Sequence, residues 1–281
     1  GSGNWAFAEG NRAEASFSFP TGVAVDHQGN VYVADWLNHR VRKITPDGQV
    51  TTLAGSGKAD FADGQGTEAS FNGPFALDVD RQGHVYVADL KNHRIRKITP
   101  AGHVTTLAGS GKATFADGQG AAASFNQPSG VAVDLQGHVY VADPQNHRIR
   151  KITPNGVVSN WVGSSQGYAD GTGTAASFNN PYSIALDLSG NVYVADSMNN
   201  CIRKITPNRV VSTYQSGIGF NQPKGIAIDS QDNLYVADTY NNKIKVVDLA
   251  KQRSETLVGT GKPGKSDQPP EFDEPAGIAF A

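Results

Sequence analysis

The sequence has one cysteine, few charges and no long apolar run. With Cys201 alone among 281 residues, an internal disulfide is excluded and the redox compartment stays open. Lysines and arginines number 24 against 26 aspartates and glutamates, so a net charge of -2 gives no electrostatic reason to bind nucleic acid or an anionic membrane. No apolar run approaches the roughly 20 residues that span a bilayer, which predicts a soluble chain. A secreted or extracytoplasmic location is favoured, although the compartment is not fixed.

What the sequence does have is an internal repeat. The motif VYVAD, or a one-letter variant of it, occurs at residues 31–35, 85–89, 139–143, 192–196 and 234–238. Alignment on the Phe that opens each repeat gives starts at Phe17, Phe71, Phe125, Phe178, Phe220 and Phe272. Steps of 42 to 54 residues between these starts suit one small sheet per repeat rather than a hairpin of helices.

Each repeat contains four short segments with a period of two. In the first repeat they are GVAVD (22–26), VYVAD (31–35), RVRKIT (40–45) and VTTLAG (50–55). These segments are rich in Val, Ile, Thr and Tyr, and Asp and Gly supply turn chemistry between them. The sequence therefore predicts an all-β chain without helices, and four-stranded antiparallel units repeated about five times indicate a β-propeller.

The motifs P-x-G-[VI]-A-[VI]-D, GN-[VL]-YVAD and N-H-R-[IV]-R resemble the NHL repeat, and the resemblance covers essentially the whole chain. It implies a single NHL-type propeller domain over residues 1–281, in a family that builds six-bladed propellers. Residues 1–16 match the tail of a repeat and residues 272–281 only its first strand, so about 28 residues of a sixth blade are lacking. Either the chain is an excerpt of a six-bladed protein, or it is a five-bladed ring with a spare strand. An unclosed ring would expose strand edges and favour self-association.

An aspartate ends the second strand of every repeat, and a basic residue begins the third strand in four of them. We predict that the two form a recurring ion pair, a structural latch rather than a catalytic site, because catalytic groups are normally asymmetric. The predicted latch residues are Asp35 and Arg40, Asp89 and Arg94, Asp143 and Arg148, Asp196, and Asp238 and Lys243. In the fourth repeat Cys201 replaces the basic residue, and we expect a buried small apolar side chain there.

Two patterns suggest a metal, but the scaffold explains both better. The first is a histidine at the same place in three successive repeats, namely His39, His93 and His147. Equivalent positions in different blades lie apart, so these rings do not converge on one ion. The second is the Asp-Gly-x-Gly loop at 63–66, 117–120 and 170–173, which offers one carboxylate where calcium takes six to eight oxygens. We expect turns there, anchored by Phe61, Phe115 and Tyr168, and we predict no metal and no cofactor.

The residues that break the repeat are the candidates for function. The loop after the second strand and the loop that enters the next blade share one face of a propeller, because strands alternate in direction. Variable positions on this face are rich in aromatic and apolar side chains, a composition typical of an interaction surface. The candidate rim residues are Phe19, Trp36, Leu37, Phe75, Leu90, Lys91, Tyr182, Met198, Lys224 and Tyr240. Alternatively, these loops pack on one another around the channel mouth.

Asp78 stands where four other repeats have Ala, on the strand nearest the axis. A carboxylate there must be solvated by the channel or paired, and together with Lys224 it is a candidate for a polar ligand site. By contrast, His84 and His138 in the first hairpin are expected to contact only solvent. The sequence favours a non-enzymatic binding or scaffold propeller for a protein, peptide or glycan. The alternative is a propeller lyase or lactone hydrolase with its site at the channel mouth, although no catalytic residue is predicted.

Overall fold

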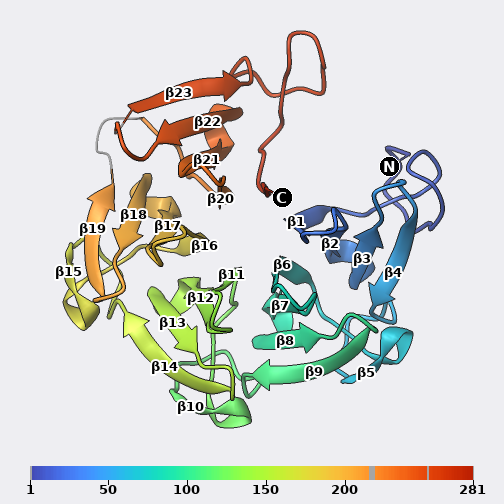
Figure 1. Ribbon diagram of the computed structural model, residues 1–281, viewed down its shortest axis with the longest axis horizontal. Helices are drawn as coiled ribbons and strands as arrows, with labels where there is room; N and C mark the ends of the chain where they lie inside the picture. The colour runs from blue at the N-terminus through green and yellow to red at the C-terminus, as the bar shows by residue number, and fades with distance from the viewer. Residues whose placement is uncertain (1, 215–218, 252, 281) are drawn as a thin grey trace. The chain divides into compact units, whose positions relative to one another are not determined.

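The structure, a computed structural model, describes residues 2–214, 219–251 and 253–280. These residues form a β-propeller of five antiparallel blades with four or five strands each, which confirms the predicted fold class (Figure 1). The chain divides into two compact units, one made of Gly1–Val141 and Lys151–Ser159, the other of Ala142–Arg150 and Asn160–Phe280. The six-bladed parent and the closure of the ring stay predictions.

Blades 1 and 2 belong to the first unit. The strands of blade 1 are β1 (Pro20–Val25), β2 (Val31–Asp35), β3 (Arg40–Ile44) and β4 (Val50–Ala54). The strands of blade 2 are β5 (Gly64–Gln65), β6 (Pro74–Val79), β7 (Val85–Asp89), β8 (Arg94–Ile98) and β9 (His103–Ala108). Consecutive strands pair in each blade, except that the short β5 pairs with β9 at the outer edge.

The other three blades repeat this plan. The strands of blade 3 are β10 (Gly118–Gln119), β11 (Gly130–Val133), β12 (Val139–Asp143), β13 (Arg148–Ile152) and β14 (Val157–Val162). Those of blade 4 are β15 (Gly171–Thr172), β16 (Pro181–Leu186), β17 (Val192–Asp196), β18 (Cys201–Ile205) and β19 (Val210–Tyr214). Those of blade 5 are β20 (Ile226–Ile228), β21 (Asn233–Asp238), β22 (Lys243–Asp248) and β23 (Arg253–Val258).

The described residues contain short 3₁₀ helices and no α-helix, as the sequence predicts. Five follow the second strand of a blade: η1 (Trp36–Asn38), η3 (Leu90–Asn92), η5 (Pro144–Asn146), η7 (Ser197–Asn199) and η8 (Thr239–Asn241). Three lie in the long loops: η2 (Gly66–Glu68), η4 (Gly120–Ala122) and η6 (Gly173–Ala175). None of these described helices has the length and apolar character of a membrane span.

The core lies between neighbouring sheets. All five residues of β7 are buried, so this strand reads as a nearly continuous apolar run instead of alternating with polar residues. Its valines share one apolar cluster with Tyr32 and Val41 of blade 1 and with Phe71, the residue that opens the repeat. Blades 1 and 2 therefore bury their facing sides against each other, as propeller blades do.

The Asp-Gly-x-Gly loops supply a fifth strand that the sequence did not reveal. In β5, Gly64 and Gln65 pair with Val104 and His103 of β9, and the equivalent glycines 118 and 171 pair with β14 and β19. Gly64 has φ +152°, a backbone conformation that side-chain-bearing residues rarely adopt. The loop thus covers the outer strand, whose free edge would otherwise invite pairing with another chain.

The latch exists, but its cation is not the one predicted. Asp35 is fully buried and pairs with Arg42 at 3.0 Å, while Arg40 donates to the carbonyl groups of Asn38 and Ser56. Arg40 and Arg42 lie on the same face of β3, and only the fully buried Arg42 needs the carboxylate, because Arg40 is partly exposed and stacks on the Phe7 ring. The other observed pairs are Asp89 with Arg96, Asp143 with Arg150, Asp196 with Arg203, and Asp238 with Lys245.

This correction applies to Arg94, Arg148 and Lys243 as it does to Arg40, because in each blade the cation two residues further along the strand makes the ion pair. Cys201 therefore replaces a residue outside the pair, and blade 4 keeps its latch through Arg203. The thiol is buried, as predicted, and burial raises its pKa to about 12. The aspartates also accept backbone N–H groups, such as that of Ser18 by Asp35, so the latch fastens the second strand to the segment that opens its blade.

Candidate functional site

Four aromatic side chains of the first unit stack in a row. The ring centroids are 6.3 Å apart for Trp5 and Phe19, 5.3 Å for Phe19 and Trp36, and 6.2 Å for Trp36 and Phe75. The ammonium group of Lys91 lies 5.3 Å from the centroid of the Trp36 ring. These five residues are called the aromatic cluster below, and such edge and cation contacts hold aromatic rings in fixed orientations.

The aromatic cluster is anchored at one end and open at the other. Trp36 and Phe75 are half-buried, whereas Phe19 is 49% exposed and Trp5 75% exposed. The backbone approaches the inner ring closely, since a Cβ on Gly73 would lie 2.3 Å from the Trp36 Nε1 atom. Gly73 therefore leaves the space that the indole occupies, and the structure presents the outer rings to solvent on a fixed base.

Phe19 adopts a backbone conformation that is unusual for a bulky residue. Its φ is 55°, in the left-handed region, where the same position of the following blades has Gly73, Gln127 and Asn180. An aromatic residue with positive φ is uncommon and carries strain on the order of 1–3 kcal/mol. Strain of this kind persists where the surroundings hold it in place, and it occurs often at functional sites.

The sequence placed four of the five members of the aromatic cluster on the rim, Phe19, Trp36, Phe75 and Lys91, but missed Trp5. Trp5 forms a parallel bridge with Phe17, a position that Ala59 takes before blade 2 and Gln166 before blade 4. Trp5 breaks the repeat in a long loop. The search for residues that break the repeat, which singled out Trp36, would have found Trp5 if it had been extended to this loop. Of the other candidate rim residues in this unit, Leu37 is exposed and Leu90 is half-buried.

The second unit brings together three other candidates. The ammonium group of Lys224 lies 5.4 Å from the Tyr240 ring centroid, 5.9 Å from the Tyr182 ring centroid and 3.9 Å from a carboxylate oxygen of Glu274. Burial and the neighbouring Tyr240 raise the pKa of Tyr182. Tyr240 is exposed, as is Met198. Tyr182, Lys224 and Tyr240, called the tyrosine cluster below, therefore form a second aromatic surface whose charge is partly balanced.

Asp78 ties two inner strands together. One of its carboxylate oxygens accepts the backbone N–H of Val79 and the other that of Val133 in β11, both at 2.8 Å. Burial raises the pKa of this carboxyl to about 6 although both hydrogen bonds lower it. The observed contacts give Asp78 a structural role between β6 and β11, and the polar site that it would form with Lys224 stays a prediction.

The repeated histidines are inter-blade clamps. His39 accepts the backbone N–H of Gly73 through Nδ1 at 3.1 Å, and His93 and His147 accept the matching N–H groups of the next blades. An accepting Nδ1 must be unprotonated, and burial together with nearby cations lowers the pKa of all three rings. Within the described ranges, no three His, Cys, Asp or Glu side chains gather where they could hold a metal ion.

Four of the five blades match a known repeat. The NHL repeat matches residues 17–44, 71–98, 125–152 and 220–247. Protein SUPPRESSOR OF QUENCHING 1, chloroplastic, from Arabidopsis thaliana is 32% identical over 151 residues, which cover 50% of this chain and 14% of that protein. NHL repeat-containing protein 2 from Bos taurus is 29% identical over 248 residues, which cover 75% of this chain and 34% of that protein. The chain thus spans about a third or less of the length of these relatives.

Three solved structures share the fold at low identity. Virginiamycin B lyase from Staphylococcus aureus aligns with TM-score 0.62 and 17% identity over 93% of this chain and 74% of that chain. A chain of the nidogen/laminin complex aligns with TM-score 0.69 and 15% identity over 95% and 86%. A gluconolactonase from Xanthomonas campestris aligns with TM-score 0.62 and 16% identity over 85% and 75%. Such likeness shows the fold alone. The four matched repeats and the five observed blades make the chain a member of the NHL-repeat β-propeller family.

Proposed function

We propose that this chain is a non-enzymatic binding module whose aromatic cluster binds a protein or peptide. The observation that carries the proposal is a row of rings in contact, fixed at Trp36 and exposed at Phe19 and Trp5. Rigid aromatic side chains bury much area at a small cost in side-chain entropy, which is why Trp and Tyr dominate binding hot spots. The tyrosine cluster supplies a second, more polar surface of the same kind.

The aligned structures include propellers of both kinds. One of the aligned propellers occurs in a protein complex, that of nidogen and laminin. Two others are a lyase and a gluconolactonase, so the enzymatic alternative has precedents in the same fold. That alternative requires an asymmetric acid, base or metal group, and stoichiometric zinc or calcium in the purified protein, measured by elemental analysis, would favour it.

The test is to select ligands with the wild-type chain and to compare variants. The immobilised chain is panned against a random-peptide phage library and probed in parallel on a glycan array. Selected peptides are expected to bind Trp36→Ala at least about tenfold more weakly, since a central aromatic anchor contributes about 2 kcal/mol or more. Leu135→Ala is the matched control, because Leu135 is 60% exposed in the same unit but is not a member of the cluster.

Equal affinity of Trp36→Ala and wild type for every selected peptide would contradict the proposal. Selective loss of glycan signals, with no peptide enriched, would reassign the aromatic cluster to carbohydrate. Tyr240→Ala tests the tyrosine cluster in the same experiment, and a loss of binding confined to this variant would move the binding surface to the second unit.

A further inference from the structure

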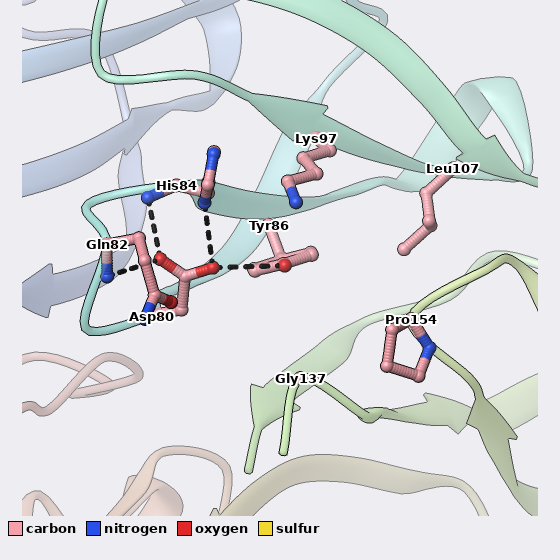
Figure 2. Close-up of a pocket in the computed structure, with 8 residues that line it drawn as sticks. All are labelled: Asp80, Gln82, His84, Tyr86, Lys97, Leu107, Gly137 and Pro154. Atoms are coloured by element: carbon pink, nitrogen blue, oxygen red, sulfur yellow. Dashed lines mark hydrogen bonds and ion pairs between the residues drawn. The ribbon is translucent and has the colours of Figure 1, made fainter. Parts of the chain in front are cut away.

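A cavity of about 180 Å³ opens in the first unit, and no sequence motif pointed to it. It lies between the first hairpin of blade 2 and residues of blade 3. Figure 2 shows the residues on its polar side and the apolar groups that complete the lining, namely Asp80, Gln82, His84, Tyr86 and Lys97, and Leu107, Gly137 and Pro154. The cavity therefore combines a charged side with an apolar side, which is the composition of a small-molecule site.

Asp80 is fully committed to holding this arrangement. One carboxylate oxygen accepts the backbone N–H groups of Gln82 at 3.0 Å and His84 at 2.9 Å. The other lies 3.0 Å from His84 Nδ1 and accepts the Tyr86 hydroxyl at 3.1 Å. Because an ionised carboxylate only accepts hydrogen bonds, Nδ1 carries a proton, and Nε2 is the ring atom left for other contacts. His84 is thus held in one orientation and does not simply face solvent, as the sequence suggested.

The ammonium group of Lys97 has hydrogen-bond donors available for a ligand. Its ammonium lies 5.2 Å from the Tyr86 ring centroid, and the described residues give it no ion-pair partner. An ammonium has three donors and prefers an anionic acceptor. The same Lys over Tyr contact recurs in other blades, for example Lys43 over Tyr32, so the contact itself belongs to the repeat. Blade 2 differs from blade 1 in having His84 where blade 1 has Asn30, which bonds Asp26 in the same way.

We infer that this cavity binds a small organic carboxylate whose charged group pairs with Lys97 and whose apolar part packs against Leu107 and Pro154. His84 provides a second polar contact at the edge of the cavity. The Asp80 carboxylate does not compete for the lysine, because its four donors occupy both oxygens. This site is separate from the aromatic cluster and does not depend on the function proposed above.

The experiment compares benzoate with its neutral isostere benzamide, at constant ionic strength, by two-dimensional NMR on the wild-type chain. Benzoate is expected to cause saturable shifts in the signals of residues 80–86 and of Lys97, and benzamide to bind at least about fivefold more weakly. Lys97→Met is expected to weaken benzoate binding about tenfold or more, because a hydrogen bond to a charged group is lost. Lys43→Met, the same change in blade 1, is the matched control and leaves benzoate binding unchanged. His84→Asn copies blade 1 and is expected to weaken binding a few fold.

Equal shifts with benzoate and benzamide would overturn the inference, and so would equal losses from Lys97→Met and Lys43→Met, since both mean that no specific charge is recognised. Shifts that do not saturate, or that map away from the cavity, would overturn it as well. If Lys97→Met does not fold, the comparison of benzoate with benzamide on the wild type decides.

Discussion

Blade 1 and blade 5 follow one repeat but build its two recurring contacts with different side chains. The latch cation is the fully buried Arg42 in blade 1 and the partly buried Lys245 in blade 5, and each lies 3.0 Å from its aspartate. The clamp residue is His39 in blade 1 and Asn242 in blade 5, and each accepts a backbone N–H from the next repeat at 3.1 Å. The frame therefore conserves contacts rather than residue types, so a change of residue there does not indicate function.

The positions around the loops differ in another way. Phe19 precedes β1 where Gln222 takes the equivalent position in blade 5, and Trp36 follows β2 where Thr239 follows β21. Phe19 and Trp36 stack on each other, whereas the Thr239 hydroxyl is buried and donates to the Pro275 carbonyl group. Here the contact itself changes from blade to blade. The candidate binding residues therefore differ from the frame residues because they make different contacts in different blades, and not only because the residue type changes.

The latch gives the largest expected effect. Arg42→Met removes a fully buried cation and leaves Asp35 unpaired, which costs about 3–5 kcal/mol of unfolding free energy. Lys245→Met should cost less, about 2 kcal/mol, because the lysine side chain is 12% exposed and water can reach Asp238 once it is gone. Urea unfolding followed by circular dichroism measures both values.

The control for the latch is Lys251→Met, which breaks an exposed ion pair with Asp248 and should leave the free energy of unfolding nearly unchanged. If Arg42→Met and Lys251→Met had equal effects, the buried pair would not be what stabilises blade 1. If Arg40→Met lowered the free energy of unfolding more than Arg42→Met, the result would favour the predicted pair of Asp35 with Arg40 over the observed pair with Arg42.

The sequence predicted the blades and the residue at which the second strand of each blade ends, because those features repeat. It could not predict the partner of Asp35, because Arg40 and Arg42 share one face of β3 and only burial in the folded blade distinguishes them. The two-residue strand β5 is too short to produce a periodic signal. The row from Trp5 to Phe75 joins the segment before β1, the helix η1 and the strand β6, so sequence alone can nominate its members but cannot show that they touch.

The clamps give an intermediate effect that depends on pH. The rings of His39, His93 and His147 have lowered pKa values in the folded chain, so the unfolded chain binds more protons at pH values just below the ordinary pKa of 6.5. The contribution of these histidines to the free energy of unfolding is therefore fully present above about pH 6.5. It is lost as the pH drops through this window. Each clamp is one hydrogen bond, worth about 0.5–1.5 kcal/mol.

Replacing all three histidines by Asn copies blades 4 and 5, where Asn200 and Asn242 make the same contact. Between about pH 7.5 and pH 5 this variant should lose about 1–3 kcal/mol less stability than the wild type, because an amide does not titrate in this range. Parallel stability curves for the two proteins would show that the histidines do not act as clamps in solution.

The smallest expected effect separates strain from contact at Phe19. Phe19→Ala loses two ring contacts, each worth about 0.5–1.5 kcal/mol, and keeps a residue with a Cβ in the left-handed region. Phe19→Asn loses the same contacts but introduces a residue that tolerates this region, as Asn180 does in blade 4. Phe19→Asn should therefore be more stable than Phe19→Ala by about 0.5–1 kcal/mol in urea unfolding, while both lose ligands selected by the wild type. Equal stability of the two variants would mean that Phe19 stores no strain. The stacked rings would then be the feature that distinguishes this position of blade 1 from that of blade 5.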